Sequence, residues 1–200
     1  MSLEGVLRDS NEIEVAVADR LNARLDAYLA AVERQRDLAV GVISRPRGIF
    51  AASEIDKWSE NQLPAIIVAT PGTTGTPEKG GDGYYRATYQ LEIAAIVSTS
   101  GDGSSRRLAQ RYAAAIRPTI LQERSLDTGL AAMSFQGETL DAIDIDDRRT
   151  LFGSVSLFEV TLEQIVNVRK GPLPEDRDDP GTVNVADTVT VEIDNQEITP

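Results

Sequence analysis

The chain has 200 residues, 41% of them hydrophobic, and its 32 acidic and 20 basic side chains give a formal charge of −12. Cysteine and histidine are both absent, which excludes thiolate and histidine nucleophiles and Cys- or His-ligated metal sites within this sequence. The negative charge argues against sequence-independent binding of DNA or RNA, although nucleic acid can still pass along an acidic surface without being held. We therefore expect a protein that works by association rather than an enzyme, with no cofactor and no metal.

The sequence contains no membrane or export signal. No stretch approaches the roughly 20 apolar residues that a membrane-spanning helix needs. The first five residues show no basic region followed by an apolar run, which a secretory signal would require. We expect a soluble protein made in the cytoplasm, with no membrane partner.

Residues 9–38 predict a long amphipathic helix, because apolar side chains recur at three- and four-residue steps. Asp9 followed by Glu12 has the spacing of a capping box, and Ser10 is an alternative cap. The apolar stripe comprises Ile13, Val17, Leu21, Leu25, Tyr28, Leu29 and Val32. Off this stripe we expect Arg20, Arg24, Glu33 and Arg34.

Three β segments are predicted between this helix and the next. Residues 40–44 form a short β-like run, and Ser53 can then cap a brief helical turn. Residues 64–70 form a continuous apolar run, which is typical of a strand covered on both faces. Residues 84–99 alternate apolar and polar side chains with period two and predict the clearest strand.

The Gly-, Thr- and Pro-rich residues 71–83 predict a mobile loop. This loop lacks the Gly-Lys-Ser/Thr ending of a phosphate-binding P-loop and opens no helix. Two interpretations stay open and equally weighted: an assembly loop that orders against a neighbouring subunit, or a disordered hairpin connection. The candidate interface residues here are Thr73, Thr74, Thr76 and Lys79.

A second helix is predicted from residue 104 to about residue 123, with Pro118 expected to kink it or end it early. Its arginines are expected to lie away from the buried stripe. A wetted helix face, or salt bridges to an acidic neighbour, is favoured over a nucleic-acid site, which would need a wider basic patch with aromatics. The candidate interface residues on this helix are Arg106, Arg107 and Arg111.

Two further strands and an extended tail complete the chain. Residues 131–135 continue after Gly137 into 139–145, and a turn leads into a long strand over 151–168. The predicted class is α+β: a mainly antiparallel sheet packed by two helices, in the order helix-β-β-β-helix-β-β. This domain covers residues 1–170.

Residues 171–200 form an acidic arm that contains proline and glycine. Within this arm, residues 188–193 can pair as one short strand, perhaps on another subunit. Val189, Val191 and Ile193 are the candidate interface residues there.

The densest carboxylate group is Asp141, Asp144, Asp146 and Asp147. A Ca²⁺ or Mg²⁺ site, or an acid–base pair, is one interpretation, but the order of a calcium loop is absent. A solvated hairpin turn, neutralised by Arg148 and Arg149, is favoured.

Five segments in this order carry a resemblance to a known family. They are LPAIIVATPG (63–72), YYRATYQLEIAAIV (84–97), SRRLAQRYAAAIRPTIL (105–121), AMSFQGETLDAIDI (132–145) and TLFGSVSLFEVTLEQIV (150–166). After an N-terminal helix, residues 63–173 resemble the tail terminator (tail completion) proteins of long-tailed bacteriophages and the neck proteins related to them. The arm over 171–200 lies outside the family pattern.

The resemblance implies a virion structural protein that assembles with copies of itself into a six-membered ring. Such a ring sits on the last ring of tail-tube protein, stops tube growth and offers a surface to the head–tail connector, while DNA passes through. The family supplies no catalytic residues. Two alternatives stay open: another neck, connector or minor tail protein of the same architecture, and, less favoured, a carboxylate-dependent metal enzyme or ligand-binding domain.

Overall fold

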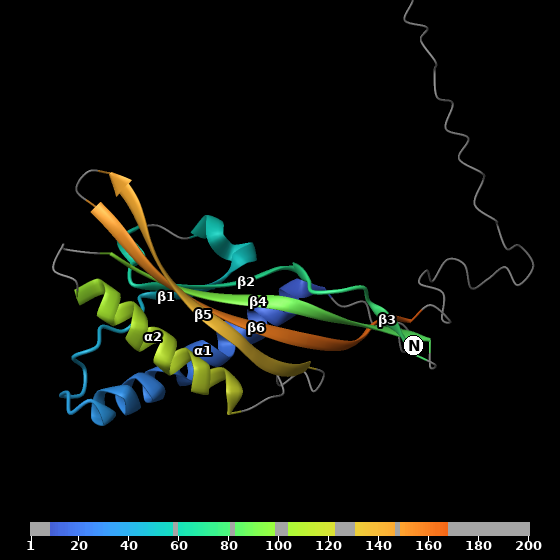
Figure 1. The fold of residues 1–200 in the computed structure, drawn as a ribbon, viewed down its shortest axis with the longest axis horizontal. Coiled ribbons are helices and arrows are strands. Elements are labelled where there is room, and N and C mark those ends of the chain that lie inside the picture. Colours follow the sequence, from blue (N-terminus) through green and yellow to red (C-terminus); the bar gives the residue numbers. More distant parts are fainter. Residues whose placement is uncertain are drawn as a thin grey trace, which may run out of the picture.

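The computed structural model describes residues 9–57, 60–80, 83–98, 104–122, 131–146 and 149–167. Two helices cover one face of a six-stranded, mostly antiparallel sheet, which confirms the predicted α+β class (Figure 1). The elements are α1 (Ser10–Gln35), β1 (Gly48–Ala51), two 3-10 helices (Ala52–Lys57 and Glu60–Gln62), β2 (Ala65–Thr73), β3 (Glu78–Lys79), β4 (Tyr84–Ser98), α2 (Ser104–Leu121), β5 (Ala131–Asp146) and β6 (Arg149–Asn167).

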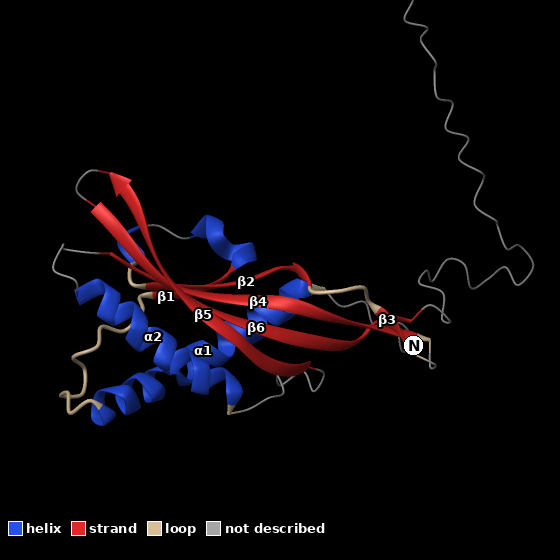
Figure 2. Ribbon diagram, in the orientation of Figure 1, coloured by secondary structure: helices blue, strands red, loops and turns tan. Residues whose placement is uncertain are grey.

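The sheet has the strand order β1-β2-β4-β6-β5, with β3 paired to β4 beyond the end of β2. Among the described strands, β1 and β2 run parallel and the other pairings are antiparallel. β4 and β6 are long enough to extend past both helices, so one end of the sheet projects as an arm (Figure 2). The helices therefore cover only part of the sheet.

Helix α1 begins where the sequence predicts. Asp9 is its N-cap, and its Oδ1 atom accepts a hydrogen bond from the backbone N–H of Glu12 at 3.2 Å. The apolar stripe faces the sheet and α2, as expected. The expectation that Arg20 and Glu33 lie off the buried stripe is wrong, because both side chains are buried.

Small side chains let α2 approach the sheet closely. The Ser154 hydroxyl on β6 donates to the carbonyl of Ala109 on α2 at 3.0 Å, and both residues are fully buried. Tyr112, also fully buried, donates its hydroxyl to the carbonyl of Ser44 at 2.5 Å. These bonds fix α2 against β6 on one side and against the chain that leaves α1 on the other.

The β-like run predicted over residues 40–44 is wrong. These residues form turns, and the first strand is β1, four residues further on. The physical reason is that the Glu33 carboxylate accepts the N–H groups of Gly41 and Ile43, which a strand ladder would otherwise use. Gly41 also has a φ of 92°, a left-handed value that glycine adopts readily and that lies outside regular strand geometry.

The mobile loop predicted over residues 71–83 is corrected as well. β2 continues through Thr73, and β3 then pairs Glu78 with Arg86 and Lys79 with Tyr85. The N–H of Gly80 donates to the carbonyl of Tyr84 at 2.8 Å and closes the hairpin. The Gly-, Thr- and Pro-rich composition of this segment does not predict a strand. The strand forms because its residues pair with β4.

Pro118 does not end α2 early, because the helix continues to Leu121, whereas the predicted kink stays a prediction. Proline removes the hydrogen bond that its N–H would have donated to the carbonyl of Ala114, which lies on a half-exposed face. The Thr119 hydroxyl donates to the carbonyl of Ala115 at 2.8 Å, and Ile120 is fully buried. Packing of the last helical turn therefore compensates for the hydrogen bond that Pro118 removes.

The two predicted segments at residues 131–145 form one strand, β5, with a register shift between Phe135 and Gly137. Residues 168–200, which include the predicted strand over 188–193, lie outside the described residues. Neither of the two described α-helices is long and apolar enough to cross a membrane.

Candidate assembly surfaces

The first predicted surface lies on the projecting arm of the sheet. Thr73 pairs with Tyr89 of β4, and the N–H of Thr74 donates to the carbonyl of Thr88 at 2.8 Å. Lys79 on β3 also pairs with β4 and is exposed. The arm therefore presents these candidate side chains from a fixed backbone rather than from a free loop.

A polar cleft of about 280 Å³ lies on this arm. Its lining includes Thr74, Thr76 and Glu78. On the floor, the hydroxyls of Thr88 and Thr161 lie 3.0 Å apart. Hydroxyl and carboxylate groups of this kind suit hydrogen bonds to the backbone of a neighbouring chain.

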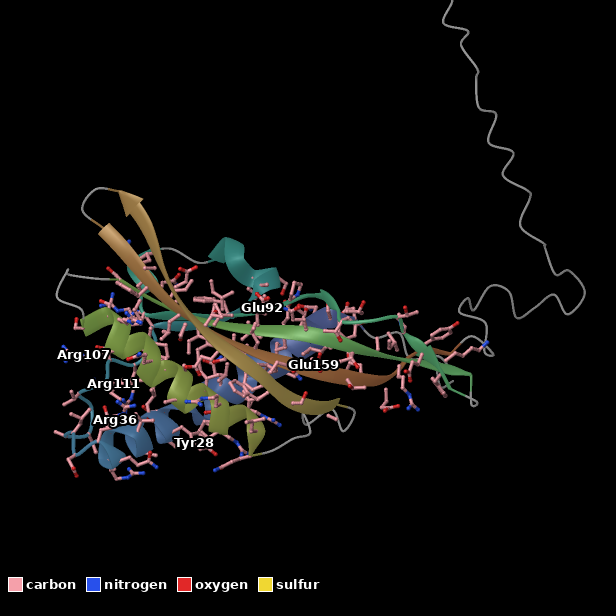
Figure 3. The ribbon with its side chains drawn as sticks, viewed as in Figure 1. Tyr28, Arg36, Glu92, Arg107, Arg111 and Glu159 are labelled. Atoms are coloured by element: carbon pink, nitrogen blue, oxygen red, sulfur yellow. The ribbon has the colours of Figure 1, made fainter. Side chains whose placement is uncertain are left out.

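The second predicted surface is basic and lies at the end of the helix pair far from β3 (Figure 3). Arg107 and Arg111 lie one turn apart on α2, and Arg36 caps α1 at the same end. We call these three residues the arginine cluster. Within the described part of the chain, none of them has a carboxylate within 4.0 Å, and the Nε atom of Arg111 is buried without a hydrogen-bond partner. Arg106, the remaining candidate on α2, is exposed and directly precedes Arg107 in the sequence.

Beside the arginine cluster lies a turn that the sequence did not identify as a surface. We call residues 37–45 the tip loop. Val40 and Val42 on it are 68% and 55% exposed, and they are two of the three large hydrophobic side chains that are exposed among the described residues. The third is Val15 on α1, at 41%. Val40 and Val42 therefore form a small exposed apolar surface on this turn.

The tip loop is held rigidly from beneath by Glu33. The two carboxylate oxygens of Glu33 accept the N–H groups of Gly41 at 3.0 Å and Ile43 at 2.7 Å. Arg45 donates to both oxygens, at 3.0 and 3.3 Å, and also pairs with Asp26. These bonds fix the backbone around Val40 and Val42 within the isolated chain.

The charge of this network is stable over the whole physiological range. Hydrogen bonds from Arg45 and from the Gly41 N–H lower the pKa of Glu33 to about 2. The bond to Glu33 raises the pKa of Arg45 above its already high value. Nearby, burial raises the pKa of the Tyr112 hydroxyl, which stays protonated and keeps its bond to Ser44.

An apolar groove lies at the other end of α2, between that helix and the edge strand β5. Its volume is about 460 Å³, and its lining includes Ala114, Pro118, Leu121 and Phe135. Phe135 packs edge-on against Phe158, with ring centroids 5.4 Å apart. We call this hollow the α2–β5 groove.

Arg117 on the rim of the α2–β5 groove is already paired. Its guanidinium lies 5.8 Å from the centre of the Phe135 ring, and its Nε atom lies 3.3 Å from Glu138 Oε2. Glu159, on the neighbouring strand, accepts a hydrogen bond from Gln136 at 2.9 Å. Since Phe158 and Val160 face the helices, the alternation along β6 places Glu159 on the opposite face of the sheet, so the groove rim holds the paired charges of Arg117 and Glu138.

Most of the predicted carboxylate group lies outside the described residues, so the choice between a metal site and a solvated turn stays a prediction. Asp141 is exposed, and its Oδ1 atom accepts the N–H of Ala142 at 2.8 Å. The side chains of Asp144 and Asp146, and all of Asp147, lie outside the described residues. No group of three or more Asp, Glu, His or Cys side chains that could hold a metal ion occurs in the part that is described.

The candidates Val189, Val191 and Ile193 also lie outside the described residues. The structure thus separates the remaining candidates into two groups. One lies on the projecting end of the sheet (Thr73, Thr74, Thr76, Lys79), and the other lies at the basic end of the helix pair (Arg106, Arg107, Arg111). Sequence reasoning missed the tip loop because Val40-Gly41-Val42-Ile43 has the composition of a strand. Gly41 within that run was the available signal.

Comparison with known proteins gives a fold likeness only. No family model matches the chain, and no curated protein matches it. A solved structure entitled "Virion of native gene transfer agent (GTA) particle" contains a chain similar to this one, with a TM-score of 0.46 and 18% sequence identity. The similarity covers 78% of this chain and 99% of that one.

Proposed function

We propose that the protein is a virion structural component, a tail terminator. Copies of it form a six-membered ring on the end of the tail tube, stop tube growth and join the tube to the head–tail connector while DNA passes through. The ring works through its surfaces and has no catalytic step. Residues 171–200 act as an arm that contacts a neighbouring subunit in this ring.

The observation that carries the proposal is the order of elements. α1, a strand at residues 65–73, the long strand β4, α2 and the paired strands β5 and β6 follow the same sequence as the segments that resemble the terminator family. A ring also needs surfaces that join copies, and this chain offers several. They are the projecting end of the sheet with its polar cleft, the unpaired arginine cluster, the tip loop and the α2–β5 groove.

A gene deletion tests this role in the particle-producing host. Without a terminator, tail tubes continue to grow, so electron micrographs should show tubes longer than those of wild type. Complementation with the wild-type gene should restore the normal length. Headless tails of normal length beside tailless heads would instead point to a head-side neck protein and contradict the terminator role.

A second measurement uses purified protein. Mixing the chain with tail-tube protein should give ring-shaped ends on the tubes, and tube length should fall as the amount of added chain rises. The chain truncated after residue 170 should keep its melting temperature but cap tubes less completely if residues 171–200 contribute to the ring. Tubes that ignore the full-length chain at every ratio would contradict the proposal.

A further inference from the structure

The arginine cluster is a surface of unsatisfied positive charge in an acidic chain. Arg36 and Arg107 are exposed and Arg111 is half-buried, and all three lie at the same end of the helix pair (Figure 3). None of them has a carboxylate within 4.0 Å among the described residues, although the chain carries a formal charge of −12. Guanidinium groups gathered in this way repel one another, so a partner that carries carboxylates is favoured at this surface.

A partner of matching charge lies in the sequence that follows β6. Residues 175–179 read Glu-Asp-Arg-Asp-Asp, and we call them the acidic segment. Four carboxylates and one guanidinium give this segment a net formal charge of −3, which equals in magnitude the charge of the three arginines. Guanidinium and carboxylate groups also fit each other in shape, because two parallel hydrogen bonds can join them.

The acidic segment of one copy starts far from the arginine cluster of the same copy. The last described residue, Asn167, pairs with Tyr84 at one end of β4. At the other end of β4, the carbonyl of Ser98 accepts a hydrogen bond at 3.1 Å from Ser105 of α2, two residues before Arg107. β4 has 15 residues, so its two ends lie about 45 Å apart.

The chain is too short to bring the whole acidic segment across that distance. Each residue adds at most about 3.6 Å, so Glu175 lies within about 29 Å of Asn167 and Asp179 within about 43 Å, even when every residue is fully extended. A neighbouring copy has no such limit, because its own β6 can end beside the cluster. The whole segment therefore reaches the arginine cluster of a second copy and not that of its own.

We infer that the acidic segment of one copy binds the arginine cluster of a neighbouring copy through ion pairs with Arg36, Arg107 and Arg111. This inference rests on the proposed ring and names the surface that residues 171–200 contact in it. The two surfaces that meet are different, so the contact is heterologous, and repeated around an axis it closes a ring. The ion pairs form near solvent, so salt weakens the attraction.

Two other partners fit the arginine cluster less well. Glu92 and Glu159 also lack a cation partner in the described part of the chain, but they are only two carboxylates, and each accepts a hydrogen bond from a glutamine (Figure 3). Duplex nucleic acid would match the arginines, but the formal charge of −12 opposes its approach. The acidic segment matches the cluster in charge and belongs to a chain that is present in every ring.

The test is a charge exchange between two full-length variants. The cluster variant carries Arg36→Glu and Arg107→Glu, and the segment variant carries Asp176→Lys, Asp178→Lys and Asp179→Lys. Each alone should lower the self-association constant by about tenfold or more in sedimentation at low ionic strength, because the contact then joins like charges.

Mixing the two variants one to one should restore association close to that of wild type. The reversed cluster then meets the reversed segment, and the unchanged cluster meets the unchanged segment. A contact within one chain would be broken in both variants, and mixing would not restore it. The restored association should weaken again as the ionic strength rises.

Glu92→Gln together with Glu159→Gln is the matched control, because it removes two carboxylates and keeps the acidic segment intact. It should associate like wild type. Melting temperatures of all variants should stay close to wild type, since Arg36 and Arg107 make no ion pair in the described residues. Their effects on the helix dipoles also oppose each other, because glutamate is unfavourable at the C-cap of α1 and favourable in the first turn of α2.

Four outcomes would overturn the inference. They are association of either reversed variant as strong as wild type, a mixture no stronger than its separate components, an equal loss of association in the control, and a wild-type chain that stays monomeric at all concentrations. The second outcome, together with binding of duplex DNA that the cluster variant loses, would assign the cluster to nucleic acid.

The tail-length phenotype of the gene deletion is measured independently of these results. Overlong tubes together with any of the four outcomes would leave the terminator role standing and remove only the proposed contact. Tubes of normal length together with restored association in the mixture would contradict the terminator role and leave the contact in place.

Discussion

Two charged groups at the same end of the helix pair differ in how their charges are satisfied. The Glu33 carboxylate is fully buried and bonded to two backbone N–H groups and to Arg45. The arginine cluster, beginning only three residues later at Arg36, has no carboxylate within 4.0 Å among the described residues. The first group holds the fold together, and the second is available for a partner. Sequence position alone does not distinguish them.

The largest expected effect follows from removing the charge of Glu33. Glu33→Gln leaves one backbone N–H facing an amide NH₂ group and leaves Arg45 without its buried counter-charge. We expect the melting temperature to fall by roughly 5–15 °C, measured by circular dichroism. Asp37→Asn is the control, because it removes an exposed carboxylate from the same tip loop at a left-handed position that asparagine tolerates. A fall below about 2 °C for Glu33→Gln would mean that the network is not structural.

The pH dependence of stability sharpens the same contrast. The pKa of Glu33 is lowered from its ordinary value near 4.5 to about 2 in the folded protein. Its contribution is therefore complete above pH 4.5 and is lost as the pH falls toward 2. Urea unfolding should show a wild-type advantage over Glu33→Gln that is constant near neutral pH and shrinks across this window. A difference that is independent of pH down to 2 would contradict the assignment.

Replacing Glu14, a second buried carboxylate, should lower the stability of the fold by a smaller amount. Its carboxylate accepts the backbone N–H of Thr70 at 2.8 Å and the Thr70 hydroxyl at 2.6 Å, next to the edge of β2. Glu14→Ala should cost about 1–3 kcal/mol of unfolding free energy, measured in urea. Thr70→Val is the matched variant, since it removes the hydroxyl bond and keeps the backbone bond, and it should cost about half as much. Equal costs would show that the backbone bond contributes nothing.

The sequence predicts the parts of this fold that repeat with a regular period. The stripe of α1 and the alternation of β4 are periodic over many residues, so both elements appear within a few residues of their expected bounds. Glu33 and the tip loop are set instead by single contacts between residues 8 to 12 positions apart, which no period records. Pro118 likewise looks like a helix end until the burial of Ile120 is known.

The candidate surfaces divide in the same way. Composition identified Thr73, Thr74, Thr76 and Lys79 as unusual, but only pairing with β4 shows that they lie on a projecting arm. The run of arginines on α2 was visible in sequence, whereas the lack of carboxylate partners among the described residues needed the structure. Val40 and Val42 have strand-like composition, and their exposure follows from the turn that Glu33 imposes.

The arginine cluster should show the smallest effect on folding and a clear effect on association. Replacing Arg36 and Arg107 by glutamine removes no ion pair within the described residues, so the free energy of unfolding should change by less than about 0.5 kcal/mol per site. Self-association should weaken, and its dependence on salt between low and high ionic strength should flatten, because two cations without a carboxylate partner in the described residues no longer attract acidic groups of a neighbouring subunit. Arg45→Gln is the matched opposite: it removes a paired arginine and should destabilise the fold strongly. If the Arg36 and Arg107 variants melt as early as the Arg45 variant, the cluster is paired internally, and the contrast between the two charged groups fails.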